Sequence, residues 1–451
     1  MNESGVLELR ESSWRFVVSI SGGGSAFISD YLALPGASSS LLEALVPYSP
    51  ESTNLFLGFL PENYCSEKTA RLLASSALRR ATELESLAFA DRADSSSASR
   101  DFSRLVGIGA TATLVSSRPK RGSHRVFCAI QTRFGTFSAS LTLKKDARTR
   151  PEEERLAADF ILSTALFVAR FRKEGEKNGR ANVAWREYST SLPLKTELSL
   201  YSEDVATISW ATFDSFEASI IFESNEDARL SALCWRDGKI ELVRVASGEE
   251  FEPSRPDERR VVPSLDNRVL FPGSFNPFHE GHRQIAELAS AYSRAAQNCE
   301  LELSIRNVDK PPLDALEIVR RVDAIQKAAP GTRVWTSNAP RYVEKATLFP
   351  GATFALGTDT ILRLADPKYE GNSIERRDSV LERLRALDVK FVVFARKING
   401  AFLSKEELEA RLPDALRARC RFLLPEEFSN DVSSTELRRA ATERKTSASE
   451  R

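Results

Sequence analysis

The N-terminal part of the chain alternates short apolar runs with amphipathic segments. β-Branched, apolar runs that predict strands occupy residues 15–20, 104–115 and 124–143, the last with a turn near Gly135. Leucine and alanine recur at helical spacing over residues 67–84 and 151–173, and the second segment opens with proline and acidic residues, as helix N-termini prefer. Residues 1–175 therefore predict one α/β domain.

The middle of the chain shows a different pattern. Residues 206–224 and 228–245 are strand-like, and the Asp237–Gly238 pair predicts a hairpin turn in the second run. Residues 247–264 are polar and contain proline, as linkers do. We expect residues 176–265 to form a β-rich connector and linker without site chemistry of its own.

The C-terminal part, residues 266–451, alternates strand and helix patterns. Strand-like runs occupy residues 267–273, 300–307, 332–337, 353–357, 388–396 and 419–425, with helical patterns between them and a closing helix at 433–444. Strands separated by helices predict a doubly wound α/β fold, in which a parallel sheet carries helices on both faces. Ligands of such folds bind beyond the C-terminal ends of the strands.

One short segment gathers residues suited to binding phosphate. The chain has only three histidines, and two of them, His279 and His282, lie in FPGSFNPFHEGH, residues 271–282. A strand leads to Gly273 and a helix is predicted to begin near Gly281, so free N–H groups and the positive end of the helix dipole face the turn. Two imidazoles on the same side of that turn can both donate to one phosphate chain.

The pattern GSFNPFHEGH resembles the signature of the HxGH nucleotidyltransferase superfamily. That group includes nicotinamide- and nicotinate-mononucleotide adenylyltransferases, phosphopantetheine adenylyltransferase and small cytidylyltransferases. The resemblance implies a Rossmann-like fold and catalytic roles for His279 and His282. It also implies nucleotide contacts by the surrounding turn, namely by Gly273, Ser274, Phe275 and Gly281.

A second segment, DVSSTELRRA at 431–440, resembles another signature of the same family. Its Ser433 and Glu436 form a capping box at a helix start, which is itself an anion site. The resemblance implies that Ser434 and Thr435 bind the nucleotide and that Arg438 is a third catalytic residue.

Two strand ends add further candidates. In FALGTD, Gly357 ends a strand and Asp359 follows at its tip, where the family contacts the nucleotide; a plain N-cap role for Asp359 is the alternative. Arg396 follows a later strand at a place where the family often carries an arginine. Lys345 is a weaker candidate.

The resemblance implies adenylyl transfer from ATP, accompanied by Mg²⁺, to a phosphomonoester, with pyrophosphate as the leaving group. The SST-x-L-R and G-T-D patterns favour nicotinamide or nicotinate mononucleotide as the acceptor, which implies NAD biosynthesis, and Trp335 or Tyr342 could stack on a pyridine ring. Phosphopantetheine adenylyl transfer, cytidylyl transfer and a non-catalytic nucleotide-binding regulator remain as alternatives. The expected partners are small molecules, and homo-oligomerisation is left open.

The N-terminal part carries a second resemblance. Ser19, Ser21, Gly22 and Gly23 match an S-x-[ST]-G-G pattern, and residues 18–58 resemble the C-terminal domain of the CinA family, whose active members are nicotinamide-nucleotide amidohydrolases. Val18 replaces a family glutamate and Thr53 replaces a lysine. Because a serine nucleophile needs a base or a cation to activate it, we expect a degenerate, non-catalytic or ligand-binding domain. A bifunctional protein with an active amidase is the alternative.

Composition excludes several function classes. Lys and Arg together number 63, as do Asp and Glu, so no overall basic field favours nucleic acid. The five cysteines form no CxxC pair, which indicates a reducing compartment and no zinc site. The N-terminus lacks an apolar secretion signal and no long apolar run follows, so we expect a cytoplasmic protein without a membrane span.

Overall fold

The computed structural model describes fourteen stretches of the chain, which divide between two compact units. The described stretches are residues 2–90, 102–117, 122–177, 190–191, 198, 200–213, 218, 230–246, 250–251, 268–292, 298–306, 312–398, 400–425 and 427–428. One unit comprises Met1–Ala218 with Asp314–Leu316, and the other comprises Ser219–Leu313 with Glu317–Arg451. Each unit is a mixed α/β structure, which confirms the predicted fold class.

The first unit is built on a mixed sheet. In its described residues seven strands lie in the order β2-β1-β3-β4-β5-β7-β6. They are β1 (Arg15–Ser21), β2 (Leu41–Leu45), β3 (Leu105–Thr113), β4 (His124–Thr132), β5 (Gly135–Leu143), β6 (Thr190–Ser191) and β7 (Val205–Thr212). Strands β2, β1 and β3 are parallel, and the remaining strands pair antiparallel. The predicted hairpin near Gly135 is the β4–β5 turn.

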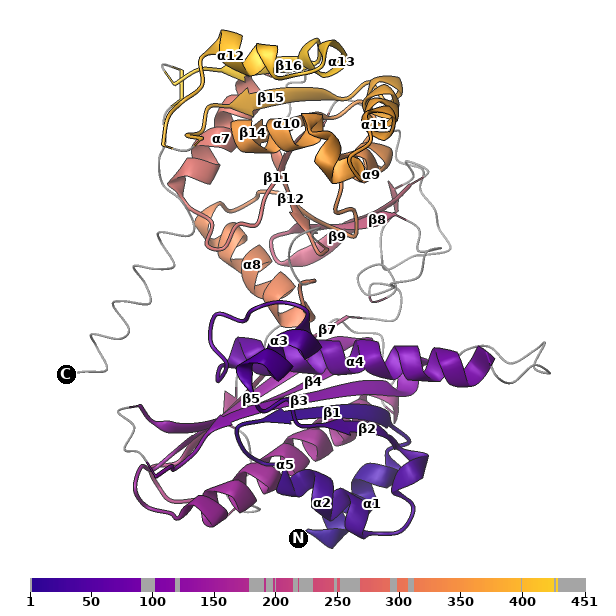
Figure 1. The fold of residues 1–451 in the computed structure, drawn as a ribbon, viewed down its shortest axis with the longest axis vertical. Coiled ribbons are helices and arrows are strands. Elements are labelled where there is room, and N and C mark those ends of the chain that lie inside the picture. The colour runs from indigo at the N-terminus through magenta and orange to yellow at the C-terminus, as the bar shows by residue number, and fades with distance from the viewer. Residues whose placement is uncertain are drawn as a thin grey trace. The chain divides into compact units, whose positions relative to one another are not determined.

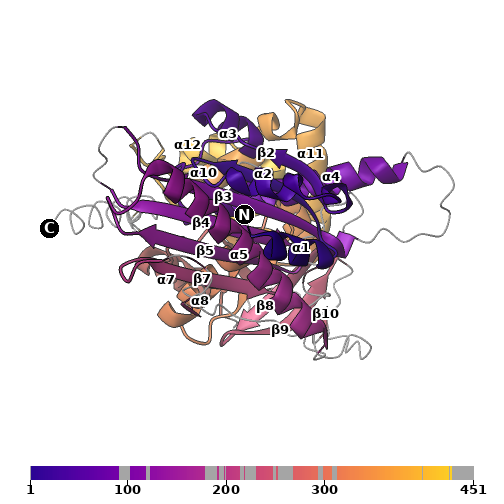
Figure 2. The ribbon, with the colours of Figure 1, turned by 90° about the horizontal axis from the view of Figure 1, so that it is seen from below.

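Helices cover both faces of this sheet. They are α1 (Glu3–Glu11), α2 (Ala26–Ala33), α3 (Pro50–Leu57), α4 (Glu67–Ala90) and α5 (Arg150–Lys177), with 3-10 turns at Ala37–Ser39 and Phe102–Arg104. Figures 1 and 2 show α4 on one face and α5 with α1 and α2 on the other. The side chains of β1 alternate accordingly, since Val17 belongs to an apolar cluster with Ala77 of α4, whereas Val18 belongs to the core cluster that includes Phe160 of α5.

The contact between α4 and β3 depends on glycine. A Cβ atom at Gly107 would lie 2.0 Å from the carbonyl oxygen of Ala74, and one at Gly109 would lie 2.3 Å from that of Ala70. The helix meets the strand with a stripe of fully buried alanines, which includes Ala70, Ala74, Ala77 and Ala81. The two glycines of β3 have no side chains and the alanines of α4 have small ones, so the backbones of the strand and the helix can approach closely.

The second unit contains the predicted parallel sheet, extended at one edge. Its described strands lie in the order β10-β9-β8-β13-β12-β11-β14-β15-β16. They are β8 (Ser231–Arg236), β9 (Lys239–Val245), β10 (Glu250–Phe251), β11 (Val269–Pro272), β12 (Glu300–Ser304), β13 (Val334–Ser337), β14 (Thr353–Gly357), β15 (Lys390–Phe394) and β16 (Cys420–Leu423). Six neighbouring strands of this sheet, in the order β13-β12-β11-β14-β15-β16, are parallel. Numbered along the chain, their order is 3-2-1-4-5-6, that of a doubly wound nucleotide-binding fold.

Helices connect these parallel strands. They are α7 (Glu280–Tyr292), α8 (Ala315–Ala328), α9 (Tyr342–Leu348), α10 (Thr358–Ala365), α11 (Ile374–Ala386), α12 (Lys405–Ala410) and α13 (Asp414–Arg417), with a 3-10 turn at Pro367–Glu370. The closing helix predicted at 433–444 lies outside the described residues. No helix in the described stretches is long and apolar enough to cross a membrane.

The segment expected to be a separate connector, residues 176–265, divides between the two sheets. Strands β6 and β7 extend the first sheet beyond β5, whereas β8 pairs antiparallel with β13 and brings β9 and β10 to the edge of the second sheet. The physical reason is the open edge of each sheet, where unpaired N–H and C=O groups gain hydrogen bonds by adding a strand. The hairpin predicted at Asp237–Gly238 is the β8–β9 turn.

Replacing Gly109 with alanine is expected to destabilise the first unit by about 1–3 kcal/mol, because the added methyl group must displace the backbone of α4 from β3. Urea unfolding followed by circular dichroism measures the change. Gly122→Ala is the matched control, since a Cβ atom there meets nothing within 4 Å, and it should leave the midpoint unchanged. An unchanged midpoint for Gly109→Ala would mean that the close contact between helix and strand is not maintained in solution.

Candidate functional site

The predicted site residues of the second unit lie at the point where the order of the parallel strands reverses. Strand β11 lies between β12 and β14, and the HxGH turn begins directly after it. Asp359 follows the end of β14, and Arg396 lies two residues beyond β15. This switch point is the crevice in which doubly wound sheets bind their ligands. The fold thus places three separate sequence candidates at one edge of the sheet.

The turn from Gly273 to Pro277 is shaped around a buried phenylalanine. Phe275 has a φ of 46°, in the left-handed region that favours glycine, and its ring is fully buried. A Cβ atom at Gly273 would lie 2.6 Å from that ring, so the ring requires a glycine at this position. The ring packs edge-on against the imidazole of His282 at 5.1 Å between centroids. Phe275 therefore packs against the histidine in the protein interior and does not face a ligand.

The two histidines form a stacked pair at the start of α7. Their ring centroids are 3.7 Å apart with an interplanar angle of 25°. The backbone N–H of His279 donates to Nδ1 of His282 at 3.2 Å, so the neutral His282 ring carries its proton on Nε2. Nδ1 of His279 is buried without a hydrogen-bond partner among the described residues. One ring nitrogen of the pair, Nδ1 of His279, is therefore left unsatisfied by the described residues.

Both imidazoles are held in the neutral form. Burial lowers the pKa of His282 to about 3, and the neighbouring His279 and Arg396 add to the shift. Burial, followed by the charge of Arg396, also lowers the pKa of His279. At neutral pH the pair consequently supplies N–H donors but no positive charge.

Asp359 and Arg396 face each other across the tips of β14 and β15. Arg396 Nη1 lies 3.8 Å from Asp359 Oδ1, which is buried and has no hydrogen-bond partner among the described residues. The N-cap of α10 is Gly357, so the alternative prediction that Asp359 is the N-cap is wrong. A Cβ atom at Gly357 would lie 2.6 Å from Arg396 Cδ, and glycine therefore lets the arginine approach.

Thr358 is a structural part of the site that the sequence analysis missed. Its hydroxyl donates to the carbonyl oxygen of Phe394 at 3.1 Å and accepts from the backbone N–H of Arg396 at 3.3 Å. The side chain is buried and joins the end of β14 to the segment that carries Arg396. Only its position between Gly357 and Asp359 could have indicated this role.

Three weaker candidates belong to the core. Lys345 is buried, forms an ion pair with Glu302 at 2.9 Å and donates to the carbonyl oxygen of Ala339 at 2.6 Å. Trp335 is fully buried and donates to Glu300 at 2.7 Å, so it cannot stack on a ligand in this structure. Tyr342 packs edge-on against Phe354 and Phe391. These contacts favour structural roles for all three.

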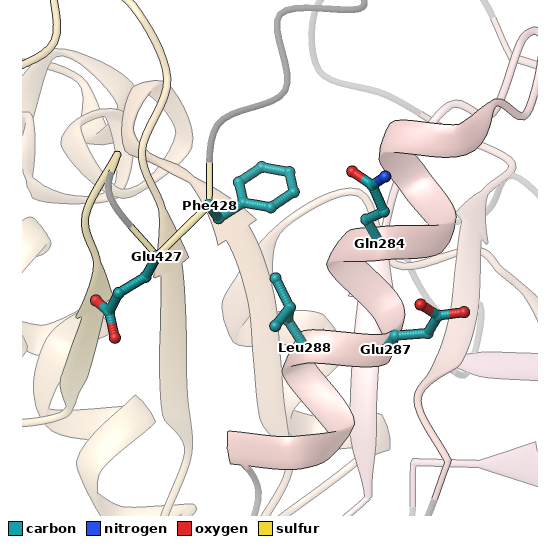
Figure 3. Close-up of a pocket in the computed structure, with 5 residues that line it drawn as sticks. All are labelled: Gln284, Glu287, Leu288, Glu427 and Phe428. Carbon is teal, nitrogen blue, oxygen red and sulfur yellow. The ribbon is translucent and has the colours of Figure 1, made fainter.

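The second signature, with Ser434, Thr435 and Arg438, lies outside the described residues. Phe428 is the last described residue before this signature. Its ring packs edge-on against that of Phe394, with the ring centroids 5.3 Å apart. Figure 3 shows an open pocket between this end and α7, lined by Gln284, Glu287, Leu288, Glu427 and Phe428. Its described lining contains two carboxylates and no cation, which makes it unsuited to a triphosphate.

The candidates of the first unit lie in two different environments. Ser19 is fully buried in the middle of β1, and its hydroxyl has no hydrogen-bond partner among the described residues. It pairs in register with Gly109 and hence faces α4. Thr53, which takes the place of the family lysine, is buried and donates to the carbonyl oxygen of Pro47 at 2.8 Å. Among the described residues Ser19 thus has no activating base, and its side chain is buried from solvent.

The glycine loop that contains Ser21, Gly22 and Gly23 leads into α2. A carboxylate of the protein lies at the start of that helix, where Glu154 of α5 accepts from the Ser25 hydroxyl at 2.9 Å and from the Ala26 N–H at 3.4 Å. Burial opposes ionisation of Glu154, but these donors and the Gly24 N–H outweigh it and lower its pKa. The position where a phosphate would bind a glycine loop is therefore occupied by Glu154.

In the described stretches no group of three or more His, Cys, Asp or Glu residues could hold a metal ion. Asp359 Oδ1, which has no hydrogen-bond partner in these stretches, is chemically suited to a cation carried by a nucleotide or to a hydroxyl of its sugar.

Part of the chain is similar to solved structures of competence-damage proteins. A CinA superfamily protein from Escherichia coli is 16% identical with a TM-score of 0.28, covering 38% of this chain and 88% of that one. A competence or damage-inducible protein from Enterobacter asburiae is 16% identical with a TM-score of 0.28, covering 38% of this chain and 96% of that one. A CinA superfamily protein from Klebsiella pneumoniae is 13% identical with a TM-score of 0.27, and the match covers 39% of this chain and 98% of that one. A search of curated proteins found no match.

The stretch from β11 to the second signature matches a known family. Residues 270–440 match the family described as cytidylyltransferase-like. The match includes the stacked histidines, Asp359 and Arg396. For this region it confirms the resemblance to the HxGH nucleotidyltransferases: residues 270–440 are similar to the cytidylyltransferase-like family.

Proposed function

We propose that the second unit transfers AMP from ATP to a phosphomonoester and releases pyrophosphate. The family match supports nucleotidyltransferase activity in general. The observation that supports the proposal most directly is the stacked, neutral histidine pair at the switch point of the sheet. Two uncharged N–H donors at a helix start are suited to phosphate oxygens whose charge grows during the reaction.

The proposed reaction needs no general base. A phosphate monoester has a second pKa of about 6, so the attacking oxygen is already ionised at neutral pH. It attacks the α-phosphorus of ATP, a new phosphoanhydride bond forms, and the bond to the β-phosphate oxygen breaks. Catalysis then depends on holding the two reactants in line and on stabilising charge in the transition state.

The residues divide this work in the proposal. His279 and His282 donate to the α/β-phosphate region, while Arg396, whose side chain is 55% exposed, supplies positive charge beside them. Ser434, Thr435 and Arg438 are proposed to bind the β/γ end from outside the described residues. Mg²⁺ bound with ATP would supply further charge neutralisation.

Nicotinamide or nicotinate mononucleotide is the acceptor that we propose, on the SST-x-L-R and G-T-D patterns. The aromatic residues considered for stacking on its ring, Trp335 and Tyr342, pack in the core and give this choice no support. Adenylyl transfer to phosphopantetheine and cytidylyl transfer from CTP therefore stay as alternatives.

For the first unit we propose a non-hydrolytic role. An amidase nucleophile must contact a base and reach its substrate, and Ser19 does neither in the described structure. The Glu154 carboxylate at the start of α2 also opposes the binding of a phosphate there, since two anions would compete for the same N–H donors.

A substrate screen tests the function directly. The full-length protein is incubated with ATP or CTP and with nicotinamide mononucleotide, nicotinate mononucleotide or phosphopantetheine, and pyrophosphate release is measured. We expect turnover to be fastest with ATP and a pyridine mononucleotide, with no ammonia released. Absence of turnover with every pair would instead favour a nucleotide-binding regulator, and ammonia release lost in Ser19→Ala would establish an amidase.

Replacing His282 with alanine is expected to lower kcat by about 10²–10³-fold, because it removes one donor to the transition state. His282→Gln should retain part of the rate, since its amide places an N–H near the position of Nε2. Arg283→Ala, on the adjacent exposed position with surface pairs to Glu280 and Glu287, is the control and should stay within about twofold. A full rate in His282→Ala would refute the proposed role of the pair.

The pH profile distinguishes neutral from charged histidines. Because the pKa of His282 is about 3 and that of His279 is lowered from its ordinary value, both rings stay neutral as the pH rises from 7 to 9. We therefore expect kcat/KM to be flat above neutral pH and to fall only below about pH 6, where the acceptor phosphate gains a proton. If kcat/KM instead fell as the pH rose from 6 to 7.5, and this fall were absent in His279→Gln, a charged imidazole would be required.

A further inference from the structure

Helix α8 contacts the HxGH turn through Arg321. Nη1 of Arg321 donates to the carbonyl oxygen of Ser274 at 3.0 Å and to its hydroxyl at 3.1 Å. The arginine side chain is only 12% exposed. One guanidinium thus contacts both the backbone and the side chain of the residue just before Phe275.

Glu317, one helical turn earlier on α8, completes this contact. Its Oε1 accepts from Nε and Nη2 of Arg321 at 2.9 and 2.7 Å. The same oxygen lies 3.4 Å from Nδ2 of Asn276, which donates to it. The pair therefore contacts the residues on both sides of Phe275.

The residue between these two contacts has a conformation that needs support. Phe275 has a φ of 46°, which a bulky side chain rarely adopts, and such backbone persists only where the surroundings determine it. Its ring in turn packs edge-on against His282. Displacement of the 274–276 backbone would consequently move the surface on which the imidazole rests.

We propose that Arg321 and Glu317 are positioning residues that hold the 274–276 turn and, through the ring of Phe275, the orientation of His282. Arg321 is not a catalytic residue in this proposal, because its Nη1, Nε and Nη2 donate to Ser274 and Glu317 and its charge is paired. The effect on catalysis rests on the proposed function, whereas the effect on the histidine does not.

The first test observes the histidine without substrate. With only three histidines in the chain, the ring signals of the full-length protein can be assigned in NMR spectra by His279→Gln and His282→Gln. In the wild type His282 should stay neutral down to pH 5. In Arg321→Ala its signals should shift and its pKa should rise toward the ordinary value of about 6.5, as the ring loses its buried support between His279, Arg396 and Phe275.

His124 provides an internal reference for folding in this experiment. It is buried in the first unit, 2.7 Å from Glu153, and its signals should not change. Arg321→Lys keeps the charge without the forked geometry and should give a smaller shift of His282. If Arg321→Ala fails to fold, Arg321→Lys and Glu317→Gln give the same reading.

The second test is kinetic. Arg321→Ala should lower kcat on the order of 10–100-fold with little change in KM for the nucleotide, since a misplaced donor weakens the transition state more than ground-state binding. Arg385→Ala is the matched control, because that arginine forms a helical pair with Glu382 at the surface of α11 and should leave the rate unchanged.

The outcomes separate the two proposals. Lower activity with unchanged His282 signals would mean that Arg321 acts on the substrate directly and would overturn the positioning role. Unchanged signals and unchanged activity would overturn it as well. Shifted His282 signals in a protein whose wild type turns over no substrate pair would support positioning while refuting the proposed function.

Discussion

The packing of the Phe275 ring against the imidazole of His282 is the contact on which the site depends. It requires a left-handed backbone at Phe275 and a glycine at position 273, and it is one of the ring contacts that bury His282, whose pKa burial lowers. The short turn therefore determines the chemical form of the residue that it presents. A histidine at the same sequence position on a solvent-exposed turn would titrate near neutral pH and would be a different reagent.

Much of this site could be predicted from the sequence because it is built from local elements in a regular order. A strand, a glycine turn and a helix start are consecutive in residues 267–283, and the parallel order brings the tips of β14 and β15 beside them. Arg321 and Thr358 could not be predicted in this way. Their roles arise from contacts with residues 47 and 36 positions away, and no spacing rule connects those positions.

The sequence was least informative about which sheet the short strands join and about the structural role of individual glycines. The strand-like pattern predicted for residues 206–224 and 228–245 does not say which sheet edge each segment will join. The two glycines of the GIGA run in β3, Gly107 and Gly109, permit the close packing of α4, a role that the sequence does not reveal. Likewise, the glycine loop after β1 suggests an anion site, and its occupant Glu154 is 129 positions from Ser25, beyond the reach of any local pattern.

The stacked histidines also limit how charge can be arranged in the site. With ring centroids 3.7 Å apart, two imidazolium ions would repel each other by about 4 kcal/mol at an effective dielectric constant of about 20. Arg396 lowers the pKa of both rings still further, so a charged pair is disfavoured by its own surroundings. The arrangement thus assigns positive charge to Arg396 and hydrogen bonding to the imidazoles. Because neutral donors attract a phosphate less strongly in the ground state than a cation does, more of their stabilisation is reserved for the transition state, where the phosphate oxygens gain charge.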